Sequence, residues 1–263
     1  MIANYHSHTA RCRHAVGTQR EYVENAIEAG FRVFGFSDHT PYPFGGDYYS
    51  TFRMRPEELE GYVRETLDLK AEYRGDIDIR LGLEAEYYPK HFSDLLRLCE
   101  GYPIEYFLLG QHATDNEYDG VFSGRPTDDE NVLARYCLQI AEALSTGCFL
   151  YAAHPDIIRF TGADEVYEKH MRPLCAAMRK MNIPAEINFL GLAENRHYPD
   201  LRFWKIAGEE GVTAVLGVDA HSPERVYLPE CEKRALGIAE KFGLRLLKEL
   251  ELPEDRAEGS PRA

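Results

Sequence analysis

The sequence predicts an α/β fold built on a mostly parallel β-sheet. Short apolar segments alternate with longer amphipathic segments along most of the chain, about seven of each, and this alternation is typical of parallel sheets covered by helices. Right-handed crossovers leave a closed barrel and an open doubly wound sheet as the two main solutions. Because neither a GxGxxG nor a Walker A motif follows any expected strand, the barrel is favoured.

The short apolar segments are the expected strands, and the amphipathic stretches between them are the expected helices. Strands are expected at residues 2–5, 33–37, 77–86, 106–110, 148–153, 185–188 and 214–218. A first helix is expected within residues 18–30, because Thr18 and Glu21 have capping-box spacing and Gly30 marks a stop. Further helices are expected at residues 56–72, 91–99, 128–146, 164–181, 200–211 and 223–248.

The length of 263 residues suits one large domain. We expect residues 1–252 to form a catalytic domain and the polar, proline-containing residues 253–263 to form a disordered tail. No apolar segment reaches the roughly 18 residues of a membrane span, and the N-terminal residues lack the basic and apolar regions of a secretory signal. These features predict a cytoplasmic protein without a membrane partner. The six cysteines form no CxxC pair, so we expect them to be reduced and mostly buried.

The chain carries a formal net charge of −14, from 30 basic and 44 acidic residues. Nucleic-acid binding depends on Lys and Arg contacts with phosphate, and the sequence contains no basic patch. Nucleic acid is therefore disfavoured as the main partner, whereas an acidic field favours attraction of a cationic small molecule. The oligomeric state stays open.

Histidine or carboxylate residues stand at or near the C-terminal end of every expected strand, and seven of the ten histidines belong to this pattern. In an α/β barrel these strand ends meet on one face, where active sites form. Residues two apart in an extended segment point the same way, so a pair such as HxH or DxH can serve one site. In chain order the pattern comprises His6, His8, His14, Asp38, His39, Glu84, Glu86, His112, His154, Asp156, Glu186, Asn188, Asp219 and His221.

This number of imidazoles and carboxylates exceeds the needs of one metal ion, since catalytic zinc takes three protein ligands and a water. Two or three divalent ions would use the full set, and Zn²⁺, Mn²⁺, Fe²⁺ or a mixture are compatible with it. Clustered metal ions generate hydroxide at neutral pH and stabilise both oxygens in phosphoester hydrolysis. Arg159 and Arg196, in the loops after the fifth and sixth strands, could add bidentate phosphate contacts, with a surface ion pair as the alternative for each.

The ordered motifs HSHT…H, SDH, GLE, a histidine after the fourth strand, AHPD and DAHSP together resemble the PHP (polymerase and histidinol phosphatase) superfamily, from His6 to about Val226. Within it, AHPDII, EIN followed by an arginine-bearing loop, and GVDAHSPERV are most similar to histidinol-phosphatases. The resemblance implies a distorted (β/α)₇ barrel with three metal ions at the C-terminal ends of the strands. It also implies three ligand sets: His6, His8, Glu84 and Asp219; Glu84, His112 and His154; and His14, His39 and His221.

The resemblance implies further roles around these sets. Glu84 would bridge two metal ions, with Glu86 as the competing candidate; Glu84 is preferred because it holds the third place in GLE. Asp38 would lie behind the ligands or carry a proton, and the Asp219 and His221 pair is an alternative proton source. Arg159 and Arg196 would neutralise phosphoryl oxygens.

Two departures from the family pattern concern substrate details more than the metal set. The family often has an acidic residue just before the third histidine of the first motif, where this chain has Arg13. The fourth-strand motif often reads GSVH, where this chain has LGQH.

The expected function is hydrolysis of a small phosphomonoester, L-histidinol phosphate, to L-histidinol and phosphate in histidine biosynthesis. The loops 45–50 and 114–120 could cover the site; Asp47, Glu117 or Asp119 would then meet the substrate ammonium, and Tyr48 or Tyr49 its ring. One alternative is a phosphoesterase of the same family acting on another small phosphomonoester, a nucleotide or phosphotyrosine. The other is a metal-binding module without turnover, which the complete ligand set disfavours.

Overall fold

The computed structural model describes residues 1–252 and confirms the predicted α/β fold with a parallel sheet. Within these residues eight strands pair in the chain order β1 to β8, and every pairing between them is parallel. The predicted tail, residues 253–263, lies outside the described residues. The strands are β1 (Ala3–Asn4), β2 (Val33–His39), β3 (Asp78–Ala85), β4 (Tyr106–Leu109), β5 (Phe149–Ala152), β6 (Ala185–Asn188), β7 (Thr213–Gly217) and β8 (Arg245–Leu246).

The strands form a distorted barrel that closes at one end only. At the C-terminal ends of the strands, Ser7 just after β1 forms a parallel bridge with Ala220 just after β7. Towards the opposite end, β8 pairs with the beginning of β7, and Leu247 and Leu250 pack in a small apolar cluster with Tyr5. The seven predicted strands are all present, and β8 is an additional strand at the edge of the sheet beside β7.

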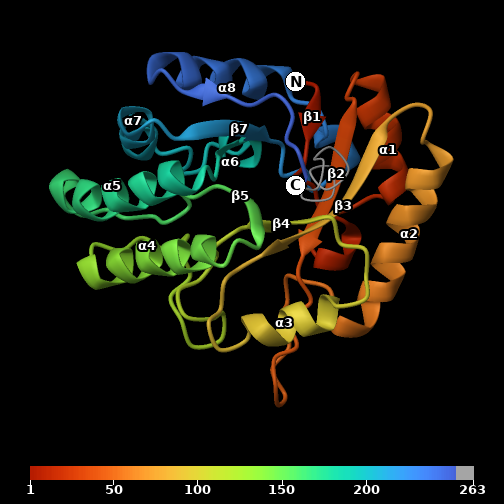
Figure 1. Ribbon diagram of the computed structural model, residues 1–263, viewed down its shortest axis with the longest axis horizontal. Helices are drawn as coiled ribbons and strands as arrows, with labels where there is room; N and C mark the ends of the chain where they lie inside the picture. Colours follow the sequence, from red (N-terminus) through yellow and green to blue (C-terminus); the bar gives the residue numbers. More distant parts are fainter. Residues whose placement is uncertain (253–263) are drawn as a thin grey trace, which may run out of the picture.

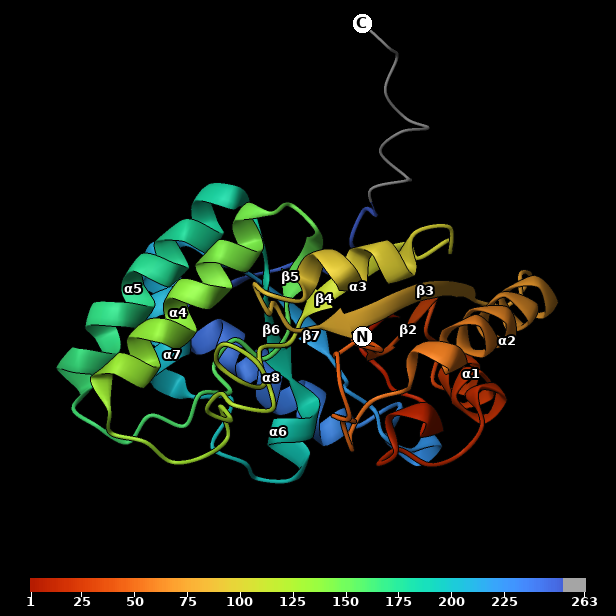
Figure 2. The same ribbon diagram turned by 90° about the horizontal axis from the view of Figure 1, so that it is seen from below.

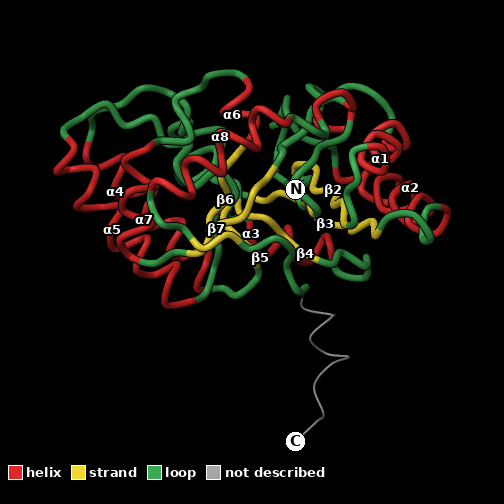
Figure 3. Tube along the Cα trace, turned by 90° about the horizontal axis from the view of Figure 1, so that it is seen from above, coloured by secondary structure: helices red, strands yellow, loops and turns green. Residues whose placement is uncertain are grey.

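Helices cover the outside of the sheet, and the strands run through the middle of the molecule (Figure 1, Figure 3). α4, α5 and α7 pack side by side on one flank, while α1 and α2 lie on the opposite flank (Figure 2). The helices are α1 (Gln19–Glu28), α2 (Leu59–Glu72), α3 (Phe92–Cys99), α4 (Glu130–Ser145), α5 (Asp164–Met181), α6 (Phe189–Ala193), α7 (Leu201–Glu210) and α8 (Pro229–Lys241). No helix within residues 1–252 has the length and apolar character needed to cross a membrane.

The helix predicted at residues 223–248 is present only over Pro229–Lys241, because proline and glycine divide this segment. It begins with a 3₁₀ turn (Pro223–Arg225), and α8 starts only at Pro229. Proline is well tolerated there because the first turn of a helix has no use for its missing N–H. α8 ends at Lys241, Gly243 follows with a φ of 63°, and the chain then enters β8.

The short helix α6 was not expected from the sequence. It starts directly after β6, and the side chain of Asn188 caps it by accepting a hydrogen bond from the Gly191 N–H at 2.9 Å. The helix therefore begins at a strand end of the polar face and places Leu190 in the wall of the cavity described below.

Apolar side chains fill the space between the sheet and the helices. The polar side chains at the C-terminal ends of the strands are buried as well. Of the six cysteines all are free and five are buried, as predicted. Several buried polar groups lie at the C-terminal ends of the strands, among them His6, His8, Asp38, Glu84, Glu86, Glu186 and Asp219. Buried charged groups are costly unless they are paired or bind metal ions, so this face of the barrel is the candidate functional site.

Candidate metal centre

The nine side chains that were predicted from the sequence to be metal ligands lie close together at the C-terminal ends of the strands. His39 ends β2, Glu84 lies in β3, and the other seven follow β1, β4, β5 and β7. His6 and His8 are fully buried, with ring centroids 5.2 Å apart. The other seven line a cavity of about 600 Å³: His14, His39, Glu84, His112, His154, Asp219 and His221.

Glu84 lies at the centre of this cluster. Its Oε1 is 2.9 Å from His154 Nε2 and 3.6 Å from His112 Nε2, and its Oε2 is 3.0 Å from His39 Nδ1. Burial alone would raise the pKa of Glu84, but the imidazoles around it, His112 foremost, hold the pKa well below its usual range. An ionised carboxylate with imidazoles on both oxygens is suited to bridge two cations. Oε2 also lies 3.5 and 3.6 Å from two further imidazole nitrogens, those of His8 and His6.

The backbone around the cluster makes room for these carboxylates. A Cβ atom at Gly110 would lie 1.9 Å from Glu84 Oε1, and one at Gly217 would lie 2.1 Å from Glu186 Oε2. His154 and Asp219 have positive φ angles of 31° and 53°, which is an unfavourable conformation for residues with a side chain. Such strain is found mainly where function requires a side chain to be aimed.

The imidazoles of His14 and His221 face each other through nitrogens that both carry lone pairs. His14 Nδ1 lies 2.8 Å from the carbonyl oxygen of Cys12, and His221 Nδ1 lies 3.0 Å from that of Asp219. A carbonyl oxygen only accepts, so each Nδ1 carries the proton and each Nε2 is free of one. Burial, followed by the effect of His8, lowers the pKa of His221 to about 3, so the ring is neutral. The two Nε2 atoms are nevertheless 2.9 Å apart. Two lone pairs at this distance repel each other, so the contact is favourable only with a cation between them.

His6 and His8 bring a second pair of imidazole nitrogens close together deeper in the barrel. His6 Nδ1 donates to Glu186 Oε2 at 2.8 Å, and His6 Nε2 lies 3.2 Å from His8 Nε2. Asp219 Oδ1 lies 3.0 Å from His8 Nε2. Asn188 Nδ2 donates to both Glu186 and Asp219, at 2.7 and 3.0 Å. Glu186 therefore fixes the orientation of His6 as outer carboxylates do at metal sites; the EIN motif contained it, but only the structure assigns this contact.

The donor set fits divalent metal ions. Two nitrogens bound to one zinc ion at about 2.0–2.1 Å in tetrahedral geometry are about 3.3 Å apart, close to the two separations between imidazole nitrogens. Glu84 Oε2 and His39 Nδ1 are buried without a hydrogen-bond partner. Groups of three potential ligand atoms lie within 4.8 Å of one another, including His14, His39 and His221, and also His6, His8 and Asp219. Nitrogen and carboxylate ligands without an obligatory thiolate suit Zn²⁺, Mn²⁺ or Fe²⁺.

Glu86 does not take the bridging position that the sequence left open for it. It lies behind His112, whose Nδ1 donates to Glu86 Oε1 at 2.8 Å. The same oxygen accepts from Arg53 Nη2 at 3.0 Å. Burial would raise the pKa of Glu86, but Arg53 and His112 together lower it to about 2. Glu86 is thus an ionised partner of an imidazole, one layer outside the cluster around Glu84.

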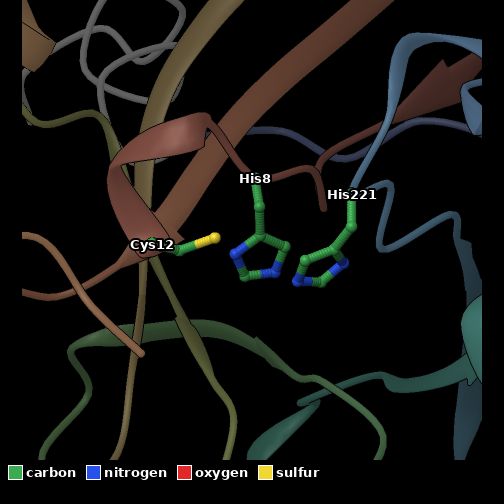
Figure 4. Close-up of side chains that lie close together, drawn as sticks. All are labelled: His8, Cys12 and His221. Atoms are coloured by element: carbon green, nitrogen blue, oxygen red, sulfur yellow. The ribbon is translucent and has the colours of Figure 1, made fainter. Parts of the chain in front are cut away.

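Asp38 and Cys12 also lie behind the cluster, on the side of His8. Asp38 is completely buried; it accepts from Thr9 Oγ1 and from the His39 N–H, and its Oδ1 is 3.5 Å from His8 Nδ1. Figure 4 shows the Cys12 thiol pointing towards the His8 ring, with the His221 ring stacked on the other side at a centroid distance of 4.2 Å. Burial raises the pKa of Cys12 to about 12, so the thiol is protonated and acts as a packing group.

The two arginines predicted to contact phosphate differ in position. Arg196 lines the cavity. Its guanidinium donates two hydrogen bonds to Glu194, at 2.9 and 2.7 Å, and one to Tyr198 Oη at 3.0 Å. Arg159 is exposed and is not among the residues that line the cavity. The structure therefore brings only Arg196 to the metal-facing cavity.

The loop residues expected to meet the substrate do not line this cavity. Glu117 is buried in an ion pair with Arg53, and Tyr48 donates to Glu117 at 3.1 Å. Asp119 accepts a hydrogen bond from Asn116, while Asp47 and Tyr49 are exposed. Side chains that the sequence analysis did not single out form the walls instead: Thr51, Phe52, Phe122, Ile157, Leu190, Glu194, His197 and Tyr198. No spacing or motif distinguishes these residues, all but Leu190 in loops, from their neighbours.

Comparisons with known proteins show which family and which folds the chain is similar to. The family model described as PHP domain matches residues 4–189. A probable histidinol-phosphatase from Deinococcus radiodurans is 31% identical over 238 residues, which cover 86% of this chain and 88% of the relative. A probable histidinol-phosphatase from Schizosaccharomyces pombe is 25% identical over 277 residues, covering 92% of this chain and 90% of the relative.

A crystal structure of histidinol phosphate phosphatase from Lactococcus lactis, complexed with zinc, L-histidinol and phosphate, has a similar fold. The TM-score is 0.74 at 20% sequence identity, and the match covers 95% of this chain and 97% of that protein. Metal-dependent tyrosine phosphatases from Bacillus subtilis and Streptococcus pneumoniae share the fold at a TM-score of 0.55 and 16% identity. The fold thus carries phosphatases with different substrates.

Proposed function

The chain belongs to the PHP domain family of metal-dependent hydrolases, and from this premise we propose that it hydrolyses L-histidinol phosphate to L-histidinol and phosphate. The observation that carries the proposal is the 31% identity with a probable histidinol-phosphatase over nearly the full length of both proteins. We further propose that the enzyme serves histidine biosynthesis in the cytoplasm, and that its partner is a small molecule and neither nucleic acid nor membrane.

The proposed ligands are Glu84 and the eight side chains clustered with it, in the three sets implied by the family motifs. Divalent ions held there would activate water and neutralise the phosphoryl oxygens. Glu84 would join two of the sets, because its Oε1 faces His154 and His112, while its Oε2 lies 3.5 and 3.6 Å from the Nε2 atoms of His8 and His6. Asp219 would join His6 and His8 in one set, since its Oδ1 is 3.5 and 3.0 Å from their Nε2 atoms.

Residues outside the ligand sets would orient the site and the substrate. Asp38, which is buried behind His8, would hold that ring in place, and its lack of exposure disfavours direct proton transfer to the substrate. Arg196 would bind the phosphoryl group from the cavity wall, where two hydrogen bonds to Glu194 Oε2 keep the guanidinium in place. The Asp219 and His221 pair is the other candidate for this proton, but burial lowers the pKa of His221 to about 3 and leaves its ring neutral. We therefore propose both side chains as metal ligands and assign the proton of the leaving alcohol to neither.

The cavity has a polar floor and an apolar wall, which suits a substrate with a phosphate at one end and an imidazole at the other. Phe52 lies edge-on to the His39 ring at 5.6 Å, and Phe122 is 43% exposed at the cavity rim. Aromatic side chains of this kind can pack against a planar ring or face a cation. A volume of about 600 Å³ is in the range of small-molecule sites.

The test is steady-state hydrolysis by the metal-loaded protein with L-histidinol phosphate, phosphotyrosine, a nucleoside monophosphate and a nucleotide phosphodiester. We expect kcat/KM of at least about 10⁴ M⁻¹s⁻¹ for L-histidinol phosphate, the lower end of ordinary enzymes, and values at least 100-fold lower for the other compounds. Equal turnover of all the phosphomonoesters would contradict the proposed substrate while leaving the hydrolase in place. Full metal content without turnover of any compound would instead favour the metal-binding module.

A further inference from the structure

Arg53 is a buried cation that belongs to none of the proposed ligand sets. Only 2% of its side chain is exposed, and its guanidinium contacts two carboxylates and a backbone carbonyl. Nε donates to Glu117 Oε2 at 3.0 Å, Nη2 donates to both Glu117 and Glu86 Oε1, and Nη1 donates to the Thr40 carbonyl at 2.9 Å. Four of the five N–H donors of the planar fork are therefore engaged, an arrangement that a lysine ammonium at this place cannot reproduce.

One arm of this network reaches the metal centre. Glu86 Oε1 accepts from Arg53 and also from His112 Nδ1, at 3.0 and 2.8 Å. The proton on Nδ1 leaves His112 Nε2 as the atom that faces Glu84, at 3.6 Å. A carboxylate behind a ligating imidazole fixes its tautomer and increases its basicity. Arg53 holds that carboxylate in place.

The other arm reaches the wall of the substrate cavity. Arg53 follows Phe52, and its guanidinium lies 4.5 Å from the centre of the Phe52 ring. Phe52 lines the cavity, with ring centroids 5.6 Å from His39 and 6.3 Å from His112. Glu117, in the loop between β4 and α4, has 2% of its side chain exposed and is held by Arg53 and Tyr48.

The charge of the network points to the same centre. Two buried carboxylates share one guanidinium, so the group of Arg53, Glu86 and Glu117 carries an excess negative charge. Burying an uncompensated charge is costly, and the side of the group that faces the cluster is His112. Cations bound at the cluster would supply the balancing charge through that imidazole.

We infer that Arg53 is a positioning residue with two roles. Through Glu86 it sets the orientation of His112 towards the metal centre, and, anchored by Glu117, it sets the placement of the Phe52 wall over the cavity. The kinetic part of this inference rests on the proposed hydrolysis of L-histidinol phosphate; the metal-binding part does not.

Three variants separate the two arms. Glu86→Gln keeps an oxygen that accepts from His112 but removes its charge, and Glu117→Gln does the same for the loop arm. Arg53→Lys keeps the charge but loses the fork. Arg55→Lys is the matched control, because Arg55 is exposed and stacks on the exposed Tyr49 at 4.7 Å. For each protein, Zn²⁺ affinity is measured by competition with a chromophoric chelator, KM and kcat with L-histidinol phosphate, and the unfolding temperature by calorimetry.

We expect Glu86→Gln to weaken Zn²⁺ binding 10- to 100-fold, as other outer-partner changes do, with KM within about threefold of the parent. Glu117→Gln should raise KM by about fivefold or more with Zn²⁺ affinity unchanged. Arg53→Lys should do both, and Arg55→Lys neither. If all three network variants lower only the unfolding temperature and leave Zn²⁺ affinity and KM at parent values, Arg53 is a structural ion pair and the inference is wrong.

Two further results keep the test decisive. If Arg53→Lys fails to fold, the opposite responses of Glu86→Gln and Glu117→Gln still decide the matter, since equal responses would refute a division into two arms. If the parent protein does not hydrolyse L-histidinol phosphate, the proposed substrate is wrong, whereas the Zn²⁺ titration of Glu86→Gln and Arg53→Lys still supports or overturns the role of Arg53.

Discussion

Replacing Glu84 by glutamine tests the centre of the proposed site most directly. Glutamine has the size of glutamate, so it can occupy the space beside Gly110, where even a methyl group would be only 1.9 Å from Glu84 Oε1. The change removes one negative charge from a side chain whose two oxygens approach imidazole nitrogens of His154 and His39 at 2.9 and 3.0 Å. It also turns an acceptor-only group into one with an N–H₂ donor.

The expected loss is larger than that for a residue behind a ligand. Partners behind metal ligands contribute about 10- to 100-fold, and Glu84 lies within 3.6 Å of the Nε2 atoms of His6 and His112 in addition to the two close contacts. A residue that joins two ligand sets should weaken both when its charge is lost. We therefore expect kcat/KM to fall at least about 1,000-fold, which corresponds to about 4 kcal/mol of transition-state stabilisation, together with a lower metal content.

The assay combines elemental analysis of the purified variant, steady-state kinetics with L-histidinol phosphate and thermal unfolding with and without a chelator. Glu60→Gln on the exposed side of α2 is the control, and it should match the parent in all three measurements. Chelation should lower the unfolding temperature of the parent, because bound metal ions stabilise the folded state, and should change that of Glu84→Gln less. Turnover near the parent value with full metal content would refute a bridging role for Glu84.

Further predictions concern residues around that centre. His221→Ala should lower the metal content per chain, because it removes one of two imidazole nitrogens that are 2.9 Å apart; unchanged content by elemental analysis would contradict a third ligand set. Arg196→Ala should raise KM about 10- to 100-fold, the usual effect of losing hydrogen bonds to a charged group. Arg159→Ala should leave KM within about threefold of the parent value, because Arg159 is exposed. Equal effects of the two changes on KM would overturn this distinction. Burial raises the pKa of Asp156 to about 7, so between about pH 4 and pH 7 the folded state binds a proton that the unfolded state has lost. The free energy of unfolding of the parent, relative to that of Asp156→Asn, should therefore fall as pH rises through this range. Urea unfolding at pH 5 and pH 8 should show a change of roughly 1–3 kcal/mol in that difference, and a difference independent of pH would show that Asp156 is not protonated in the fold.

The sequence by itself determined the fold class and the histidines and carboxylates that come together at the strand ends. Strand periodicity is local, so apolar segments and the polar residues that end them can be read along the chain. Parallel strands with helical crossovers must bring those ends to one face, which is why residues as distant as His6 and Asp219 could be expected together. Helix α1 was equally predictable, because the capping box of Thr18 and Glu21 is a local hydrogen-bond pattern and is present.

Only the tertiary structure decided which role each of two similar candidate residues has at the site. Glu84 and Glu86 face the same side of β3, since side chains repeat every two residues, and their different neighbours distinguish them: imidazoles around Glu84, Arg53 beside Glu86. Arg53 is 33 residues from Glu86 and 64 from Glu117, and no periodicity relates such distant loop positions. Arg196 and Arg159 are both loop arginines in the sequence, and only the path of each loop places one in the cavity and the other on the surface. Contacts between loops depend on the packing of the whole barrel, because a loop has no repeating geometry from which the direction of a side chain could be predicted.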